Sequence, residues 1–176
     1  MSVHLRRAAD RMPAPTASEN LVNESVANTQ RQLRAYVLID TATVEDLEFG
    51  KRPRVKVIIK NFGQTPAYAV THSWVIGIDK FPASNTLNAD IKDDSAGISI
   101  VGPGGALTHY ETLDEPLSRG HIADLKNDNY AFYVIGTVSY VDVFRHPQTT
   151  KYRLFTGGPL GLEKVMASDG NGNTAT

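Results

Sequence analysis

Apolar and polar residues alternate along most of the chain between residues 35 and 155. A period of two predicts β-strands that bury one face and leave the other in water. Turn-forming residues divide the alternation into about seven segments, with no β-α-β pattern between them. This arrangement predicts an antiparallel sandwich rather than a parallel sheet. The predicted strands lie near residues 35–47, 54–62, 70–78, 98–101, 106–113, 130–144 and 149–155.

One connection between strands, with the sequence KNFGQTPAYAV, has unusual turn chemistry. Asn61 and Gly63 reach positive φ at low cost, whereas Pro66 fixes φ and removes a backbone donor. We therefore predict a structural corner at which the chain passes from one sheet to the other. His72 and Trp74 share one face of the strand that follows, so we expect both to lie in or near the core.

The predicted fold class is mainly β, an immunoglobulin-like antiparallel β-sandwich of about seven strands over residues 35–162. A lone tryptophan on the third strand, with Tyr130 or Tyr133 opening the penultimate strand, is typical of immunoglobulin-like domains. The paired cysteines of antibody domains are absent, so the pattern indicates the architecture alone.

The residues before the first strand have a helical period. Thr16 and Glu19 fit a capping box, and a narrow apolar stripe follows at spacings of three and four, formed by Val22, Val26, Thr29 and Leu33. We predict an amphipathic helix over residues 16–34 that lies on the domain or trails from it. The alternative is a coiled-coil stub or the end of a longer stalk. Residues 1–15 are predicted to be a disordered leader and residues 163–176 a disordered tail.

Composition narrows the classes of function. Of the 176 residues, 41% are hydrophobic and 21% charged, which suits one folded domain with extensions. A net charge of -1 gives no electrostatic reason to expect nucleic acid or an anionic membrane as a partner. The absence of cysteine excludes disulfides, thiolate catalysis and cysteine-bound zinc. No apolar run is long enough for a membrane span, so the chain as given is expected to be soluble.

Catalytic motifs find little support. The five histidines form no HxH, HxxxH or HExxH pair, and no Gly-x-Ser-x-Gly elbow is present. The glycine-rich stretches GPGG and GGPLGLEK lack the lysine or the spacing of a phosphate loop, and DGNGNT lacks the distal glutamate of a calcium loop. We therefore predict a non-enzymatic domain with no cofactor and no bound metal.

Several side chains remain candidates for contact with a ligand or partner: Trp74, His109, Tyr110 and Glu111. His109 and Glu111 share a strand face that could hold a metal or position a base, although a solvated face is favoured. Asp142 ends the strongest strand, where bonds to the backbone amides of the next turn, or an ion pair with Arg145 or Lys151, are favoured over acid–base chemistry.

Basic residues also mark the strands expected to have a wet face. They are Arg54, Lys56, Lys60, Lys151 and Arg153. These residues would form a basic patch if the second strand neighboured the last. Solvation and protection of a sheet edge are the usual reasons for such charges, with a weak anionic partner as the alternative.

Two segments resemble a family of uncharacterised bacterial envelope proteins, in which an N-terminal, often membrane, helix precedes an immunoglobulin-like β-domain. RVKVIIKNFGQTPAYAV resembles their strand signature around Asn-x-Gly-x-Thr-Pro-Ala, and it also resembles generic bacterial immunoglobulin-like adhesion modules, which share the Asn-x-Gly corner. GTVSYVDVFRHPQTTKYRLF resembles their closing hairpin, matched by Gly136, Tyr140, Asp142, Phe144 and Thr150. The resemblance implies a domain on the periplasmic face of the cell envelope, at a membrane only if an anchor helix precedes this chain. It implies no activity or ligand.

These observations favour a non-catalytic interaction or structural domain whose partner is a protein and not a nucleic acid. Recognition would use the loop at residues 79–97 and the region 103–121, because sandwiches bind through loops and edge strands. The alternative is a module that binds a small molecule or carbohydrate through Trp74, Tyr110 and Tyr133, should these side chains prove exposed.

Overall fold

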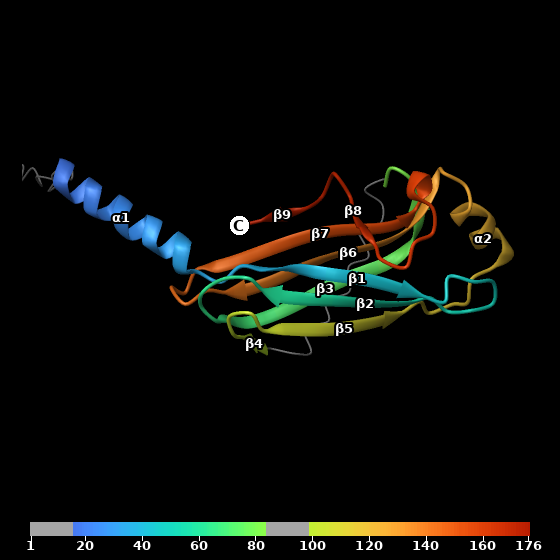
Figure 1. Ribbon diagram of the computed structural model, residues 1–176, viewed down its shortest axis with the longest axis horizontal. Coiled ribbons are helices and arrows are strands. Elements are labelled where there is room, and N and C mark those ends of the chain that lie inside the picture. The colour runs from blue at the N-terminus through green and yellow to red at the C-terminus, as the bar shows by residue number, and fades with distance from the viewer. Residues whose placement is uncertain (1–15, 84–98) are drawn as a thin grey trace, which may run out of the picture. The chain divides into compact units, whose positions relative to one another are not determined.

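The computed structural model describes residues 16–83 and 99–176 (Figure 1). The predicted leader at 1–15 and most of the predicted loop at 79–97 lie outside these described residues. The chain divides into two compact units, residues 1–32 and 33–176. No helix in the described part of the chain is long and apolar enough to cross a membrane.

The first unit contains helix α1 (Ala17–Leu33). The predicted capping box is present, because the Thr16 N–H donates to Oε2 of Glu19 at 2.7 Å and the Glu19 N–H donates to Oγ1 of Thr16 at 3.3 Å. The bond from the Thr16 N–H, and a second one from the Thr16 hydroxyl to Oε2 at 3.0 Å, lower the pKa of the Glu19 carboxyl. No residue of α1 is buried. The helix therefore exists where the period and the cap predict it.

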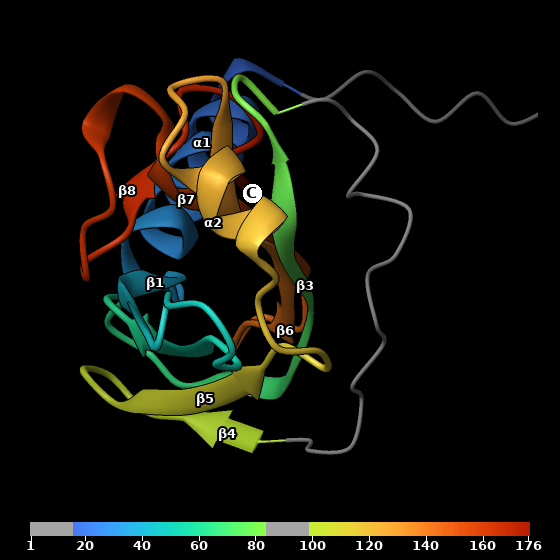
Figure 2. The same cartoon turned by 90° about the vertical axis from the view of Figure 1, so that its right-hand side faces the viewer.

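The second unit is a sandwich of two antiparallel sheets (Figures 1 and 2). The three-stranded sheet has the order β1-β2-β5 and contains β1 (Val37–Glu45), β2 (Arg54–Asn61) and β5 (Ala106–Thr112). The other sheet has the order β4-β3-β6-β7-β8 and contains β3 (Ala67–Lys80), β4 (Ser99–Val101), β6 (Tyr130–Val141), β7 (Pro147–Gly157) and β8 (Ala167–Ser168), with β9 (Thr174–Ala175) also on β7.

The strand order confirms the predicted immunoglobulin-like fold. The chain changes sheet between β2 and β3, returns for β5, and changes sheet again before β6. These crossings put the first, second and fifth strands opposite the third, sixth and seventh, as in immunoglobulin domains. A helix, α2 (Arg119–Leu125), lies across one end of the sandwich (Figure 2). A 3-10 turn (Gly158–Leu160) follows β7.

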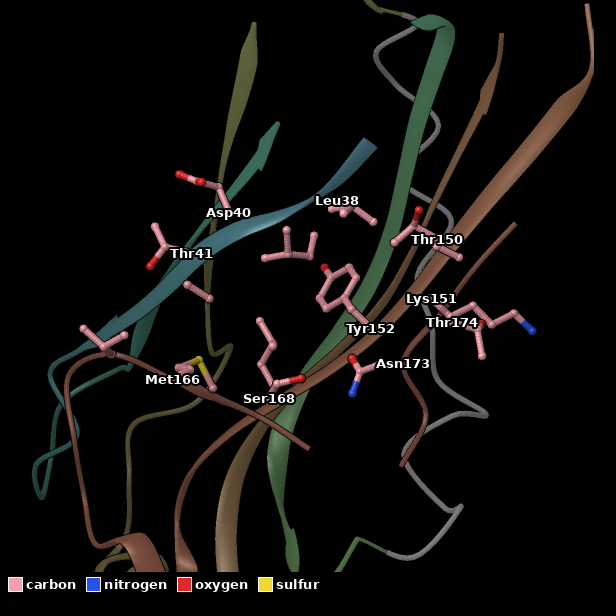
Figure 3. Close-up of a pocket in the computed structure, with 15 residues that line it drawn as sticks. Leu38, Asp40, Thr41, Thr150, Lys151, Tyr152, Met166, Ser168, Asn173 and Thr174 are labelled. Carbon is pink, nitrogen blue, oxygen red and sulfur yellow. The ribbon is translucent and has the colours of Figure 1, made fainter. Parts of the chain in front are cut away.

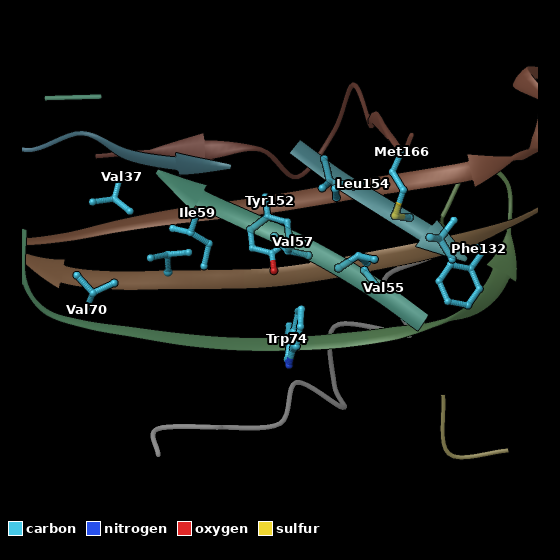
Figure 4. Close-up of a cluster of buried hydrophobic side chains, with 14 of the residues drawn as sticks. Val37, Val55, Val57, Ile59, Val70, Trp74, Phe132, Tyr152, Leu154 and Met166 are labelled. Carbon is cyan, nitrogen blue, oxygen red and sulfur yellow. The ribbon is translucent and has the colours of Figure 1, made fainter. Parts of the chain in front are cut away.

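The core lies between the two sheets and is made by the alternate residues that the period marks as apolar (Figure 4). In β2 the buried positions alternate with more exposed ones along the whole strand. Its members include Val55, Val57, Ile59, Val70, Trp74, Phe132, Val134, Val138, Tyr152 and Leu154. A second, smaller cluster lies on the other face of the larger sheet, around Tyr133 and Phe155.

The predicted disordered tail at residues 163–176 is wrong. This segment first runs beside β1, where Val44 donates to the Lys164 carbonyl and Met166 donates to the Ala42 carbonyl. It then pairs with β7 through β8 and β9. The tail is ordered because two strand edges supply hydrogen bonds and because Met166, only 7% exposed, joins the core. The pattern of residues within the tail does not predict its pairing with β1 and β7.

Candidate functional site

A cluster of aromatic and imidazole rings fills the space between the sheets. The His72 ring of β3 lies 4.8 Å from the rings of Trp74 and His109, the latter from β5. Nε2 of His72 is hydrogen-bonded to the hydroxyl of Tyr152 on β7 at 2.5 Å. The Tyr152 ring lies over Gly136, where a Cβ atom would be 2.6 Å from Cζ. These rings therefore pack against one another between the two sheets, and Trp74 is only 4% exposed.

Burial of His72 predicts a pH-dependent stability. Desolvation, and secondarily the His109 ring, lower the pKa of His72 from 6.5 to about 3. Between those values the unfolded chain binds a proton that the folded chain does not, so stability falls as pH falls, by at most about 1.4 kcal/mol per pH unit. Denaturant unfolding should show that the free energy of unfolding falls by about 2 kcal/mol between neutral pH and about pH 5 because of His72.

The control for this prediction compares two histidine variants. His72→Gln should remove that part of the pH slope, whereas His146→Gln, at a histidine whose side chain is 59% exposed, should retain it. An unchanged slope in His72→Gln would contradict the assignment.

The four candidate contact residues are not brought together. Trp74 and His109 meet inside the sandwich, and Glu111 lies half-buried on the same inward side of β5 as His109. Tyr110 points the opposite way and is 52% exposed. Tyr133 is buried and cannot serve as the exposed aromatic of the alternative prediction. Within the described residues, no group of three or more His, Asp or Glu side chains could hold a metal ion.

Asn61 is the centre of the corner between β2 and β3. Its side chain is fully buried. Oδ1 accepts hydrogen bonds from the N–H groups of Gly63 at 2.9 Å and Tyr36 at 3.1 Å. Nδ2 donates to the carbonyls of Thr65 at 2.8 Å and Val101 at 3.0 Å. One amide therefore joins three separate segments of the chain.

Gly63 and Pro66 complete this corner for steric reasons. A Cβ atom on Gly63 would lie 2.3 Å from the carbonyl oxygen of Arg34 and 2.6 Å from Cα of Ala35. Only glycine fits against a backbone at that distance. Pro66 directly precedes β3, at a position where the missing N–H removes no rung of the ladder.

Asp142 organises the turn between β6 and β7. Its buried Oδ1 accepts from the N–H groups of Phe144 and His146, both at 2.9 Å. Its Oδ2 accepts from Nε2 of Gln148 at 3.0 Å. The structure thus shows the first of the two predicted arrangements, in which the carboxylate holds the backbone amides of the turn.

The outer face of the three-stranded sheet carries the exposed chemistry. Its central strand, β2, turns three basic side chains and Ile58 outward, since the alternate positions are buried. The strand registers place these residues in four cross-strand rows: Glu45–Arg54–Thr112, Thr43–Lys56–Tyr110, Thr41–Ile58–Thr108 and Leu38–Lys60–Ala106. We call these rows the outer grid. Its remaining positions are mostly small or hydroxylated, so the surface is flat.

Aromatic rings hold the cations at both ends of the outer grid. The guanidinium of Arg54 lies 4.3 Å from the centre of the Tyr110 ring. The ammonium of Lys60 lies 5.1 Å from the centre of the Phe62 ring, which is 49% exposed. Cation–π contacts of this kind fix a side chain on the surface and stabilise it by roughly 0.5–1 kcal/mol.

The condition for a basic patch of five residues is not met, because β2 does not neighbour the last of the predicted strands. Lys151 and Arg153 belong to β7, which lies in the other sheet, so they do not join the cations of β2. Arg153 is buried beneath the tail, with Nη1 3.8 Å from Oδ2 of Asp169. Its backbone N–H donates to Oδ1 of Asn173. Recognising this difference needs the order of the strands, which the sequence does not reveal.

A pocket of about 480 Å³ lies between β1, β7 and the tail (Figure 3). Its apolar lining includes Leu38, Tyr152 and Met166, and hydroxyl, amide and charged side chains also line it. Sequence reasoning missed this pocket because the tail that forms one wall was expected to be disordered. The only local signal is the apolar pair Val165–Met166 in a stretch rich in glycine, serine and asparagine.

Comparisons with known proteins give one match. No curated protein and no solved structure matches the chain. Residues 7–156 match a family model described as a domain of unknown function, DUF8453. The match begins before α1 and ends near the end of β7, so it covers all the main strands of both sheets. The chain therefore belongs to the DUF8453 family, whose function is unknown.

Proposed function

We propose that this protein is a non-catalytic interaction domain that binds another protein through the outer grid. The observation that carries the proposal is the pair of half-exposed rings, Tyr110 and Phe62, each stacked with a cation on one flat sheet face. Aromatic and arginine side chains are enriched at protein interfaces, where a ring adds large contact area and few rotatable bonds. The other candidate rings are occupied by packing, Trp74 between the sheets and Tyr133 in the cluster on the opposite face of the larger sheet.

The place of action that we propose is the bacterial cell envelope. Its support is the resemblance of residues 54–70 and 136–155 to envelope proteins with an immunoglobulin-like domain. Fractionation of cells that express the natural gene, with detection by antibody, tests this part separately. Recovery only with cytosolic proteins would contradict it.

Site-specific photo-cross-linking in the natural host tests the interaction. A benzophenone amino acid at Tyr110 should give a discrete cross-linked protein band, and that band should weaken when Lys56→Glu is added. Tyr68 provides a matched control, because it is an exposed tyrosine, 39% accessible, on β3 of the other sheet. Equal bands from both positions, or none from Tyr110, would contradict the proposal.

The pocket between β1 and β7 favours a second candidate function, the binding of a small molecule or carbohydrate. Its volume is in the usual range for ligand sites, and it combines the Tyr152 ring with polar groups such as Thr41 and Ser168. The two candidates separate cleanly. If the pocket is the site, Ser168→Trp, which lies outside the grid, should abolish ligand binding by filling the pocket, and changes at Tyr110 should have no effect.

A further inference from the structure

We propose that the outer grid binds an extended acidic segment of a partner protein, with acidic side chains over Arg54, Lys56 and Lys60 and an apolar side chain over Ile58. This inference rests on the proposed function and specifies the chemistry of the partner. It follows from the balance of charge on the grid, from the way its cations are held, and from their spacing along β2.

The charge on the grid is unbalanced. Glu45 is the one carboxylate in its paired rows, and it stands in a corner row and pairs with Lys164 at 3.1 Å. Asp40, at the bulge of β1 before Thr41, is a second exposed carboxylate at the edge of the grid, against three cations along β2. In the described ranges, no ion pair joins the cations of β2 to a carboxylate. The whole chain has a net charge of -1, so positive charge is concentrated on this face and balanced elsewhere. Complementary potentials of this kind select acidic partners and speed their encounter.

The cations at the ends of the row are positioned before a partner arrives. Tyr110 holds Arg54 and Phe62 holds Lys60, in each case by contact with the face of a ring. A cation on a ring keeps N–H donors that can hydrogen-bond a carboxylate. Less side-chain entropy is then lost on binding, which strengthens association relative to free surface lysines.

The spacing favours a peptide over a uniform polyanion. Arg54, Lys56, Ile58 and Lys60 occupy alternate positions of one strand. An extended peptide repeats its side chains on one face at the same interval, roughly 6.7 Å, and layers of extended chains pack with their directions within about 30°. An apolar residue can lie over Ile58, whereas a polymer with charge at every unit would place a charge there. The predicted motif is acidic-x-acidic-x-apolar-x-acidic, read in either direction.

Fluorescence anisotropy with labelled peptides tests the inference on the full chain. The probe TDTDTVTDT carries the motif, and TDDTTTVDT has the same composition and charge without it. At low salt the patterned peptide should bind at least about fivefold more tightly, and Lys56→Glu should weaken it about tenfold or more because repulsion replaces attraction. Lys126→Glu, at an exposed lysine beside α2, should leave binding unchanged. Thermal melts confirm that both variants fold.

Other probes define the results that would overturn the inference. Equal binding of the two peptides would show charge attraction without a strand-shaped site. Preferential binding of polygalacturonate, single-stranded DNA or phosphatidylglycerol vesicles would assign the grid to a different class of partner. If no acidic probe binds while the cross-link from Tyr110 persists, the acidic segment is wrong and the interaction domain stands. If the cross-link is also absent, both proposals fail.

Discussion

Replacing Asn61 by alanine is expected to lower the free energy of unfolding by about 3–5 kcal/mol. The substitution leaves the N–H groups of Gly63 and Tyr36 and the carbonyls of Thr65 and Val101 without their side-chain partner. Each buried group that loses its hydrogen bond costs about 1–3 kcal/mol. Water that enters the corner replaces some of these bonds, so the total is smaller than the sum. Urea unfolding followed by Trp74 fluorescence measures the change.

Two further variants show whether the hydrogen bonds cause that loss. Asn61→Asp keeps Oδ1 as an acceptor but turns a second oxygen towards the carbonyls of Thr65 and Val101, so it should also be strongly destabilising. Asn23→Ala, on the exposed surface of α1, should change stability by less than about 0.5 kcal/mol. An Asn61→Ala protein within about 1 kcal/mol of the natural chain would mean that the corner is held by packing instead.

The features that could be predicted from the sequence are those with local causes. A period of two fixes which residues of β2, β3 and β6 face the core, because side chains alternate across any strand. The capping box of α1 needs only Thr16 and Glu19, three residues apart. The place of the corner at Asn61 and Gly63 is marked by turn residues. Neither residue has the positive φ that we gave as the reason, and the close approach of Gly63 to Arg34 and the groups that Asn61 bonds are not visible in the sequence.

The features that could not be predicted depend on which strands become neighbours. Tyr110 and His109 are adjacent in sequence, but Tyr110 faces solvent and His109 faces the other sheet. Which of the two side chains points outward is set by how β5 pairs with β2. Arg153, like Lys56, alternates with apolar residues along its strand, which predicts an exposed side chain. It is nevertheless buried, because the tail crosses that part of β7. The outer grid and the pocket are likewise products of strand order and register. The periodicity of one sequence determines neither the order of the strands nor their register.

Deleting residues 163–176 is expected to destabilise the sandwich by at least about 5 kcal/mol, a large part of the total for an ordinary domain. Losing the buried Met166 side chain alone costs about 2–5 kcal/mol. The deletion also removes the backbone bonds to Ala42, Val44 and Arg153 and leaves Phe155 uncovered on the outer face of β7. A chain truncated after residue 169 retains β8 and Met166, so it should lose only about 1–2 kcal/mol. Thermal and urea unfolding of both chains measure these differences.

The same deletion should change how the protein associates, because the tail covers an entire strand edge. Thr174 and Ala175 pair with β7, and the side chains of Asn173 and Thr176 accept from the N–H groups of Arg153 and Thr149 as a neighbouring strand would. Without this cover, β7 presents free N–H and C=O groups that a second copy can pair with. Light scattering after size-exclusion chromatography should therefore show dimers or larger species for the chain that ends at residue 162. A folded monomer would mean that the edge is protected without its tail.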